Sequence, residues 1–171
     1  MSSLNIYRRA LLASILFVSL LQTVGCAIKL APSYDKTVVD GLTSVNEELM
    51  TFFASVSSGT NASDFDQRKP TYDRLVGKLG AIKIQSAARP VPRSQLDQIF
   101  GSARDVSVSP QELRRSEPPS VPAIDLMIKT MEKMRDTDQL QGVSAIEVSA
   151  FKGQIEISLD QALTYEKALE R

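Results

Sequence analysis

The sequence predicts an all-α protein: an antiparallel bundle of about four helices, with a long proline-containing connection between the second and third helices. Apolar residues recur at spacings of three and four in four separate segments, and residues that typically start or stop helices bound each segment. The predicted helices have similar lengths of about 20 to 26 residues, or roughly 30 to 39 Å. Helices of comparable length can pack side by side as an antiparallel bundle.

The first helix is predicted to start at Ser33 and to run for about 25 residues, ending before Gly59. Its apolar stripe consists of Tyr34, Val38, Leu42, Val45, Leu49, Phe52 and Val56. A stripe of this kind marks the face that packs into a core.

The second helix is predicted to start at Ser63, with Asp66 as the acid of a capping box, and to end near Ala88. Arg89 and Pro90 follow, and proline stops a helix. The stripe of this helix consists of Phe65, Tyr72, Leu75, Leu79 and Ile82.

The segment from residue 89 to residue 121 is expected to be an irregular connection that holds only short helices. Prolines interrupt it at positions 90, 92, 110, 118 and 119. It also carries arginines at positions 89, 93, 104, 114 and 115 among several acids. We expect a solvated loop here, and a patch that binds an anion or a partner is the alternative.

The third helix is predicted from about Pro122 to Leu140, with Gly142 in a left-handed position after it. Its stripe consists of Ile124, Met127, Ile128, Met131 and Met134. Methionines at helical spacing are usually core residues, although a soft-metal site or a binding groove is the alternative.

The fourth helix is predicted to start at a capping box formed by Ser144 and Glu147 and to reach Glu170. Residues 145–160 also alternate like two strands joined at Lys152 and Gly153, so a hairpin is the alternative. The helix is favoured because its stripe continues into a strongly helical C-terminal segment; the stripe consists of Val148, Phe151, Ile155, Leu159 and Ala162.

The first 25 residues have the order of a secretory signal peptide. A basic start with Arg8 and Arg9 precedes an apolar block of twelve residues (10–21), and small residues follow. An uncleaved membrane anchor is the alternative, but Ser14, Ser19 and Gln22 interrupt the apolar run that a membrane-spanning helix of about 20 residues requires.

Val24, Gly25 and Cys26 resemble the end of the lipobox of bacterial lipoproteins, and the resemblance covers only the N-terminal thirty residues. It implies cleavage before Cys26, a diacylglyceryl group on its sulfur and an acyl group on its amino terminus. Thr23 departs from the pattern, in which leucine is usual at that position. Ala27, rather than aspartate, implies release to the outer membrane, where the domain would face the periplasm.

Cys26 is the only cysteine of the 171 residues, so no internal disulfide is available to an exported domain. A buried core thiol is the alternative use of a lone cysteine. The predicted organisation is therefore a signal peptide at residues 1–25, a tether at residues 26–32 and a bundle domain at residues 33–171. A tether of six or seven residues reaches at most about 25 Å, so we expect the bundle to lie close to the membrane.

Composition narrows the function. Basic and acidic residues number 20 each, and loss of Arg8 and Arg9 leaves a slight excess of acids, so a nucleic-acid partner is not expected. The chain contains no histidine and no phosphate-binding glycine loop, which excludes imidazole-dependent nucleophiles and His-containing metal sites. We expect no enzyme activity, no metal and no cofactor other than the lipid on Cys26.

The sequence thus predicts a membrane-anchored lipoprotein whose bundle binds an envelope partner. The alternative is a carrier for a small apolar or lipid ligand held between the helices, near the methionines and Phe52 or Phe53.

Overall fold

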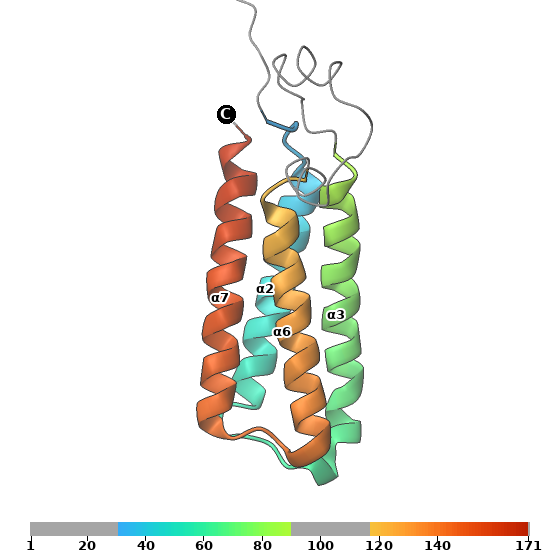
Figure 1. Ribbon diagram of the computed structural model, residues 1–171, viewed down its shortest axis with the longest axis vertical. Helices are drawn as coiled ribbons and strands as arrows, with labels where there is room; N and C mark the ends of the chain where they lie inside the picture. The colour runs from blue at the N-terminus through green and yellow to red at the C-terminus, as the bar shows by residue number, and fades with distance from the viewer. Residues whose placement is uncertain (1–30, 90–116, 171) are drawn as a thin grey trace, which may run out of the picture.

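The computed structural model describes residues 31–89 and 117–170, and in them it places four long helices (Figure 1). These are α2 (Lys36–Ser55), α3 (Phe65–Ala87), α6 (Ser120–Gln141) and α7 (Ala145–Ala168). A short 3-10 helix, η1 (Ala62–Asp64), precedes α3. No strand occurs in these two ranges, so the predicted all-α class is confirmed.

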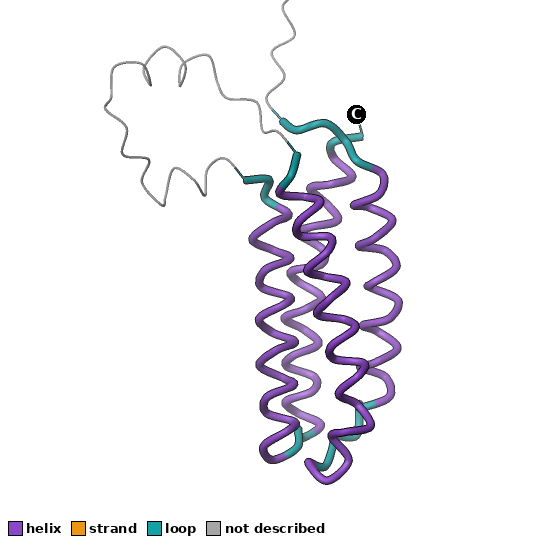
Figure 2. The backbone as a smooth tube through the Cα atoms, turned by 90° about the vertical axis from the view of Figure 1, so that its right-hand side faces the viewer, coloured by secondary structure: helices purple, strands orange, loops and turns teal. Residues whose placement is uncertain are grey.

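The four helices form a ring in which neighbours run in opposite directions (Figures 1 and 2). Each helix packs against the next in the order α2, α3, α6, α7 and back to α2, and the most extensive contacts are those of α6 with α3 and α7. The predicted antiparallel bundle of four helices is therefore confirmed.

The bundle has two distinct ends. We call one the turn end: it holds the α2–α3 connection (residues 56–64) and the α6–α7 turn (residues 142–144). We call the other the terminal end: it holds residues 31–35, Arg89, residues 117–120 and the end of α7 (Figure 1).

The core lies where the four apolar stripes meet. Nearly all the predicted stripe residues are buried, and the exceptions, which are partly buried, are Tyr34, Ile128 and Phe151. Phe52 packs edge-on against Tyr72, with 4.8 Å between ring centroids, and so joins α2 to α3. Helical periodicity therefore identified the buried face of each helix.

The starts of the first two helices differ from the prediction. α2 begins at Lys36 rather than Ser33, because Asp35 is its N-cap and accepts hydrogen bonds from the amide (2.9 Å) and hydroxyl (2.6 Å) of Thr37. The capping box predicted for Ser63 and Asp66 is wrong. Residues 62–64 instead form η1, and α3 follows from Phe65.

The second half of the fold follows the prediction more closely. α6 begins at Ser120, two residues before the predicted start, so the irregular connection does not extend to residue 121. The capping box of Ser144 and Glu147 is confirmed, and so is the helix rather than the hairpin over residues 145–160. Gly142 has a positive φ of 81°, as expected.

The predicted signal peptide, the lipid attachment site Cys26 and the arginines at positions 93, 104, 114 and 115 lie outside the described residues. Of the helices that the structure describes, none combines the length and apolar character needed to cross a membrane.

Candidate functional site

At the turn end, two connections that are far apart in the sequence are joined to each other. The amide of Thr60 donates to the carbonyl of Val143 at 2.8 Å, and the amide of Val143 donates to the hydroxyl of Thr60 at 2.9 Å. Gly59 and Ser144 form an isolated antiparallel bridge beside these bonds. The turn end is therefore fixed by backbone hydrogen bonds between the α2–α3 connection and the α6–α7 turn.

Two glycines permit this close approach. Gly59 has a φ of 93° and Gly142 a φ of 81°, in the region that L side chains rarely adopt. A Cβ atom on Gly59 would lie 2.9 Å from the carbonyl oxygen of Val143, and one on Gly142 would overlap the carbonyl oxygen of Thr60. Side chains at these positions would force the two connections apart.

A buried ion pair lies just inside the turn end. The side chain of Asp138 has no exposed surface, and its carboxylate accepts hydrogen bonds from Arg68 Nε (2.8 Å), Arg68 Nη2 (2.7 Å) and the hydroxyl of Thr60 (2.6 Å). The hydroxyl of Tyr72 donates a longer bond of 3.3 Å to the same carboxylate. Burial by itself would raise the pKa of Asp138, but the hydrogen bonds from Arg68 and Thr60 outweigh it and hold the pKa below its usual value.

The outer surface of the turn end forms an open hollow of about 640 Å³. Residues 58–61 line it from one side, and residues 141–144 and Glu147 line it from the other. The carboxylate of Glu147 is already bonded to the amide and hydroxyl of Ser144, at 2.9 and 2.7 Å. The lining therefore offers amides, hydroxyls and backbone groups for hydrogen bonding, and its acid is held in a helix cap.

Exposed apolar side chains lie at the α6–α7 turn, close to this hollow. Leu140 lies in the last turn of α6 with 82% of its surface exposed, and Ile146 lies in the first turn of α7 with 83% exposed. Each Å² of apolar surface left in water costs about 25 cal/mol of free energy, so burial of these two side chains against another molecule would be favourable.

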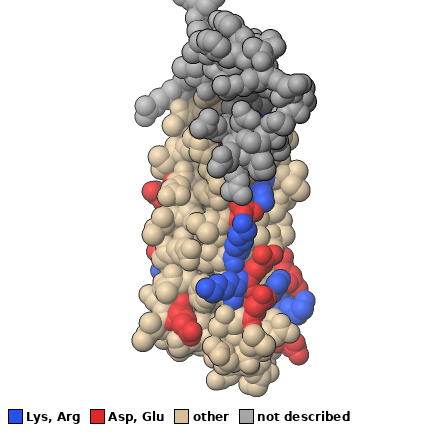
Figure 3. All heavy atoms as spheres, in the orientation of Figure 1, with Lys and Arg blue, Asp and Glu red and all other residues tan. Residues whose placement is uncertain are grey.

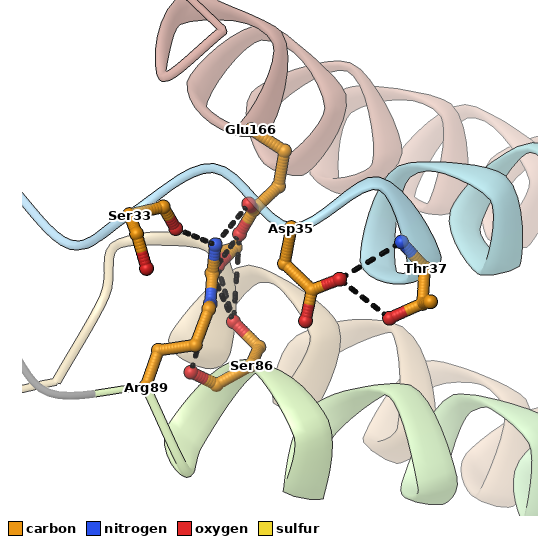
Figure 4. Close-up of polar contacts among 7 residues, drawn as sticks. Ser33, Asp35, Thr37, Ser86, Arg89 and Glu166 are labelled. Carbon is orange, nitrogen blue, oxygen red and sulfur yellow. Dashed lines mark hydrogen bonds and ion pairs between the residues drawn. The ribbon is translucent and has the colours of Figure 1, made fainter.

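The terminal end holds a second buried ion pair (Figure 4). Arg89 donates from both terminal nitrogens to the two carboxylate oxygens of Glu166, with a distance of 2.7 Å for Nη1. The side chain of Glu166 has no exposed surface and that of Arg89 has 7%. This two-pronged geometry is the one in which arginine binds a carboxylate most strongly. The prediction that Arg89 belongs to a solvated loop is therefore wrong.

Two serines and the N-terminal segment complete this cluster. Arg89 Nη2 donates to the hydroxyl of Ser86 at 3.0 Å, and that hydroxyl lies 2.7 Å from the hydroxyl of Ser120. Arg89 Nη1 also lies 3.4 Å from the carbonyl oxygen of Ser33, just before Asp35 caps α2 (Figure 4). Arg89 thus connects α3, α6, α7 and the segment that enters the bundle.

The sequence analysis did not single out these two ion pairs, although the spacing carries a signal for them. Asp138 continues the buried stripe of Met127, Met131 and Met134, and Glu166 continues that of Ile155, Leu159 and Ala162. Arg68 and Arg89 fall on the stripe of α3 in the same way. A charge at a stripe position near a helix end therefore indicates a buried, paired group.

Several other acids pair with basic residues at the surface of the bundle. Figure 3 shows charged side chains of both signs gathered on the side of α3 and α6, and much of the remaining surface in that view is uncharged. Among them, Asp125 pairs with Lys83 and Lys129, and Asp73 pairs with Lys69. Exposed pairs of this kind contribute at most about 1 kcal/mol each.

In the described ranges, histidine, cysteine, aspartate and glutamate nowhere gather in a group of three that could hold a metal ion. Met127, Met131 and Met134 have no exposed surface and belong to the core. Comparison of the chain with protein-family models, with curated proteins and with solved structures found no match. The geometry of the two ends is therefore the basis for a functional proposal.

Proposed function

We propose that this chain is a bacterial lipoprotein, anchored through acylated Cys26 to the outer membrane and facing the periplasm. Its helical bundle would bind another envelope protein through the turn end. The lipobox-like residues 24–26 after a signal-like segment support the anchor. Two or three acyl chains give a stable attachment because each buried methylene contributes about 0.8 kcal/mol.

The position of the first residues that the structure describes supports an anchor close to the bundle. Pro32 is already buried, and the carbonyl of Ser33 is a partner of Arg89 at the terminal end. Six backbone steps separate Cys26 from Pro32 and span at most about 22 Å, however they are arranged. The terminal end would therefore stay near the membrane.

The turn end is the part of the bundle farthest along the helices from this attachment. α6 has 22 residues and is about 33 Å long, which places Leu140 and the hollow well beyond the reach of the tether. The observation that carries the proposal is the combination of Leu140 and Ile146, each more than 80% exposed, with the polar hollow between the two connections. Apolar anchors beside polar groups are typical of protein interfaces.

The carrier alternative has less support. The methionines and Phe53 that would line a site between the helices have at most 2% of their surface exposed, and they pack in one continuous core. A core packed in this way has few voids larger than a water molecule. The turn end is therefore the better candidate for binding.

Metabolic labelling with a clickable fatty acid tests the anchor. We expect label on the wild-type chain and none on Cys26→Ala. Label on both chains, or on neither, would reject the lipoprotein assignment.

Photo-crosslinking in intact cells tests the turn end. A photoreactive residue at position 140 should give a discrete adduct with another envelope protein, whereas the same residue at Ile84 should not. Ile84 is a matched control because it is 72% exposed and lies on α3, away from the turn end. Equal yields from the two positions would reject this surface.

A further inference from the structure

α7 has two apolar faces, and only one of them packs into the bundle. Val148, Ile155 and Leu159 face the core. On the opposite side, Ile146 is 83% exposed and Ile157 is 64% exposed. This second face explains why residues 145–160 alternate in apolar character like a pair of strands in the sequence.

The outward face is a continuous uncharged line. Ile146, Ala150, Gly153 and Ile157 follow one another at spacings of four, three and four residues, so they lie along one side of the helix. A Cβ atom added to Gly153 would meet nothing within 4 Å. This spacing is that of a coiled-coil seam, with small residues in the middle that allow two helices to approach closely.

No other described element packs on this line. Among the helices that the structure describes, α7 contacts α2 and α6, and its buried residues lie on the opposite side from the line. A single exposed isoleucine such as Ile84 is ordinary, but two on one uncharged helix line form a patch.

The line is also complementary to itself. Its four residues are symmetric about the midpoint between residues 151 and 152. If two copies of α7 packed in opposite directions about that point, Ile146 would face Ile157 of the second copy and Ala150 would face Gly153 of the second copy. Large residues would therefore meet at both ends of the contact and small residues would meet in its centre, which is the arrangement of an isologous two-fold interface.

The flanking charges favour the antiparallel direction. Beside the seam, Glu147 would lie opposite Gln154 of the second copy, and Ser149 opposite Glu156, so no two like charges meet. In a parallel pair the same line continues to Asp160, which would face its own counterpart. Facing carboxylates repel, so the parallel arrangement is disfavoured.

We propose that this outward face of α7 is an antiparallel self-association surface, and that its occupant is a second copy of this chain. The seam from residue 146 to residue 157 is only about 16 Å long. Its four residues per copy are fewer than the roughly 20 to 30 residues that each partner contributes to a stable interface, so association should be weak and dependent on concentration. The inference does not depend on the lipid anchor. The seam shares Ile146 with the proposed turn-end surface, whereas Ala150, Gly153 and Ile157 belong to the seam alone.

Disulfide crosslinking of the full chain in cells tests both the occupant and the direction. Two copies with different tags are expressed together, one with Ile146→Cys and the other with Ile157→Cys. The wild type, whose one cysteine is Cys26, gives the background level of crosslinking. The antiparallel pair should link position 146 to position 157. It should not link either position to itself, because like positions would lie about 16 Å apart along the axis.

The matched control is Ile84→Cys, which places a thiol at a similarly exposed isoleucine on α3. It should give no crosslink above the wild-type baseline. Addition of Ala150→Lys to both copies should lower the 146–157 crosslink by about tenfold, with the helical circular dichroism unchanged because Ala150 is exposed.

Three outcomes would overturn the proposal. Crosslinks of each position to itself would show a parallel pair, adducts with a different protein would show another occupant, and no crosslink above the baseline would show that the face stays in water.

Discussion

Both ends of the bundle bury a carboxylate, but they differ in the hydrogen bonds that surround it. Each buries a carboxylate completely, Asp138 at the turn end and Glu166 at the terminal end, and each pairs it with an arginine from α3 or the residues directly after it. At the turn end, backbone hydrogen bonds between two connections also hold the helices together. At the terminal end, side chains alone form the described links between α3, α6 and α7.

This difference indicates how much each ion pair contributes. Asp138 has further donors in Thr60 and Tyr72. For Glu166, the one donor besides Arg89 among the described residues is the hydroxyl of Ser86 at 3.5 Å. The terminal end should therefore depend more on its arginine than the turn end does. Under the proposed lipid anchor, Arg89 would also hold the segment around Ser33 that follows the tether.

The largest expected effect is that of removing either arginine. Arg89→Ala leaves Glu166 buried with almost no donor, so we expect a loss of about 4 to 5 kcal/mol in the free energy of unfolding. Arg68→Ala leaves Asp138 bonded to Thr60 and Tyr72, and we expect about 3 kcal/mol. Urea unfolding followed by circular dichroism at pH 7 measures both. Equal losses, or a larger loss for Arg68→Ala, would contradict the proposed difference between the ends.

The next effect tests the backbone of the turn end. Gly142→Ala places a side chain at a φ of 81° and against the carbonyl of Thr60, so we expect a loss of at least about 2 kcal/mol. Gly80→Ala is the control, because Gly80 lies inside α3 with nothing within 4 Å of an added Cβ. That substitution should stabilise the protein by about 0.5 to 1 kcal/mol. An unchanged free energy of unfolding in Gly142→Ala would mean that the α2–α3 connection and the α6–α7 turn can move apart without cost.

A pH series tests the hydrogen bonds of Asp138. The pKa of Asp138 is lower in the folded state than its usual value of 3.8, so its contribution is present above pH 3.8 and is lost as pH falls below that value through the folded pKa. Other carboxylates with lowered pKa, such as Asp125, also contribute to the fall in the wild type's free energy of unfolding at low pH. Urea unfolding at pH 7 and pH 3 should therefore show a smaller drop in the free energy of unfolding for Asp138→Asn than for the wild type. Equal losses would exclude the proposed role of these bonds.

The smallest effects concern the helix caps at the two ends. Ser144→Ala removes the N-cap of α7 in a turn that is hydrogen-bonded to the α2–α3 connection. We therefore expect the free energy of unfolding of the whole bundle to fall by about 1 kcal/mol. Asp35→Ala removes the cap of α2 at the terminal end, where the first turn can open without disturbing the turn end. We expect a smaller global loss, with faster hydrogen exchange confined to the first turn of α2. Faster exchange across the whole bundle would contradict this local opening.

Much of the fold could be predicted from single residues and their spacing. The stripes identified the buried faces, and Ser144 with Glu147 identified the start of α7, because local hydrogen bonds and helical geometry decide these features. The start of α3 was not predicted, since residues 62–64 form a 3-10 turn that brings Thr60 and Asn61 to Asp138 and Arg68. Contacts with Asp138 on α6 therefore helped to determine where α3 begins, and neighbouring residues alone did not.

The sequence by itself determined that four helices form and which side of each one is buried, because both follow from the order of residues along one helix. The spacing of Arg68, Asp138 and Glu166 continues those buried sides as well, although the sequence analysis did not use this signal and expected Arg89 in a solvated loop. Only the tertiary structure decided which arginine binds which acid, since the partners lie 70 and 77 residues apart and meet because of the order and direction in which the helices pack. It alone also left Ile146 and Ile157 exposed, because within the part of the chain that the structure describes α7 has neighbours on one of its two apolar faces.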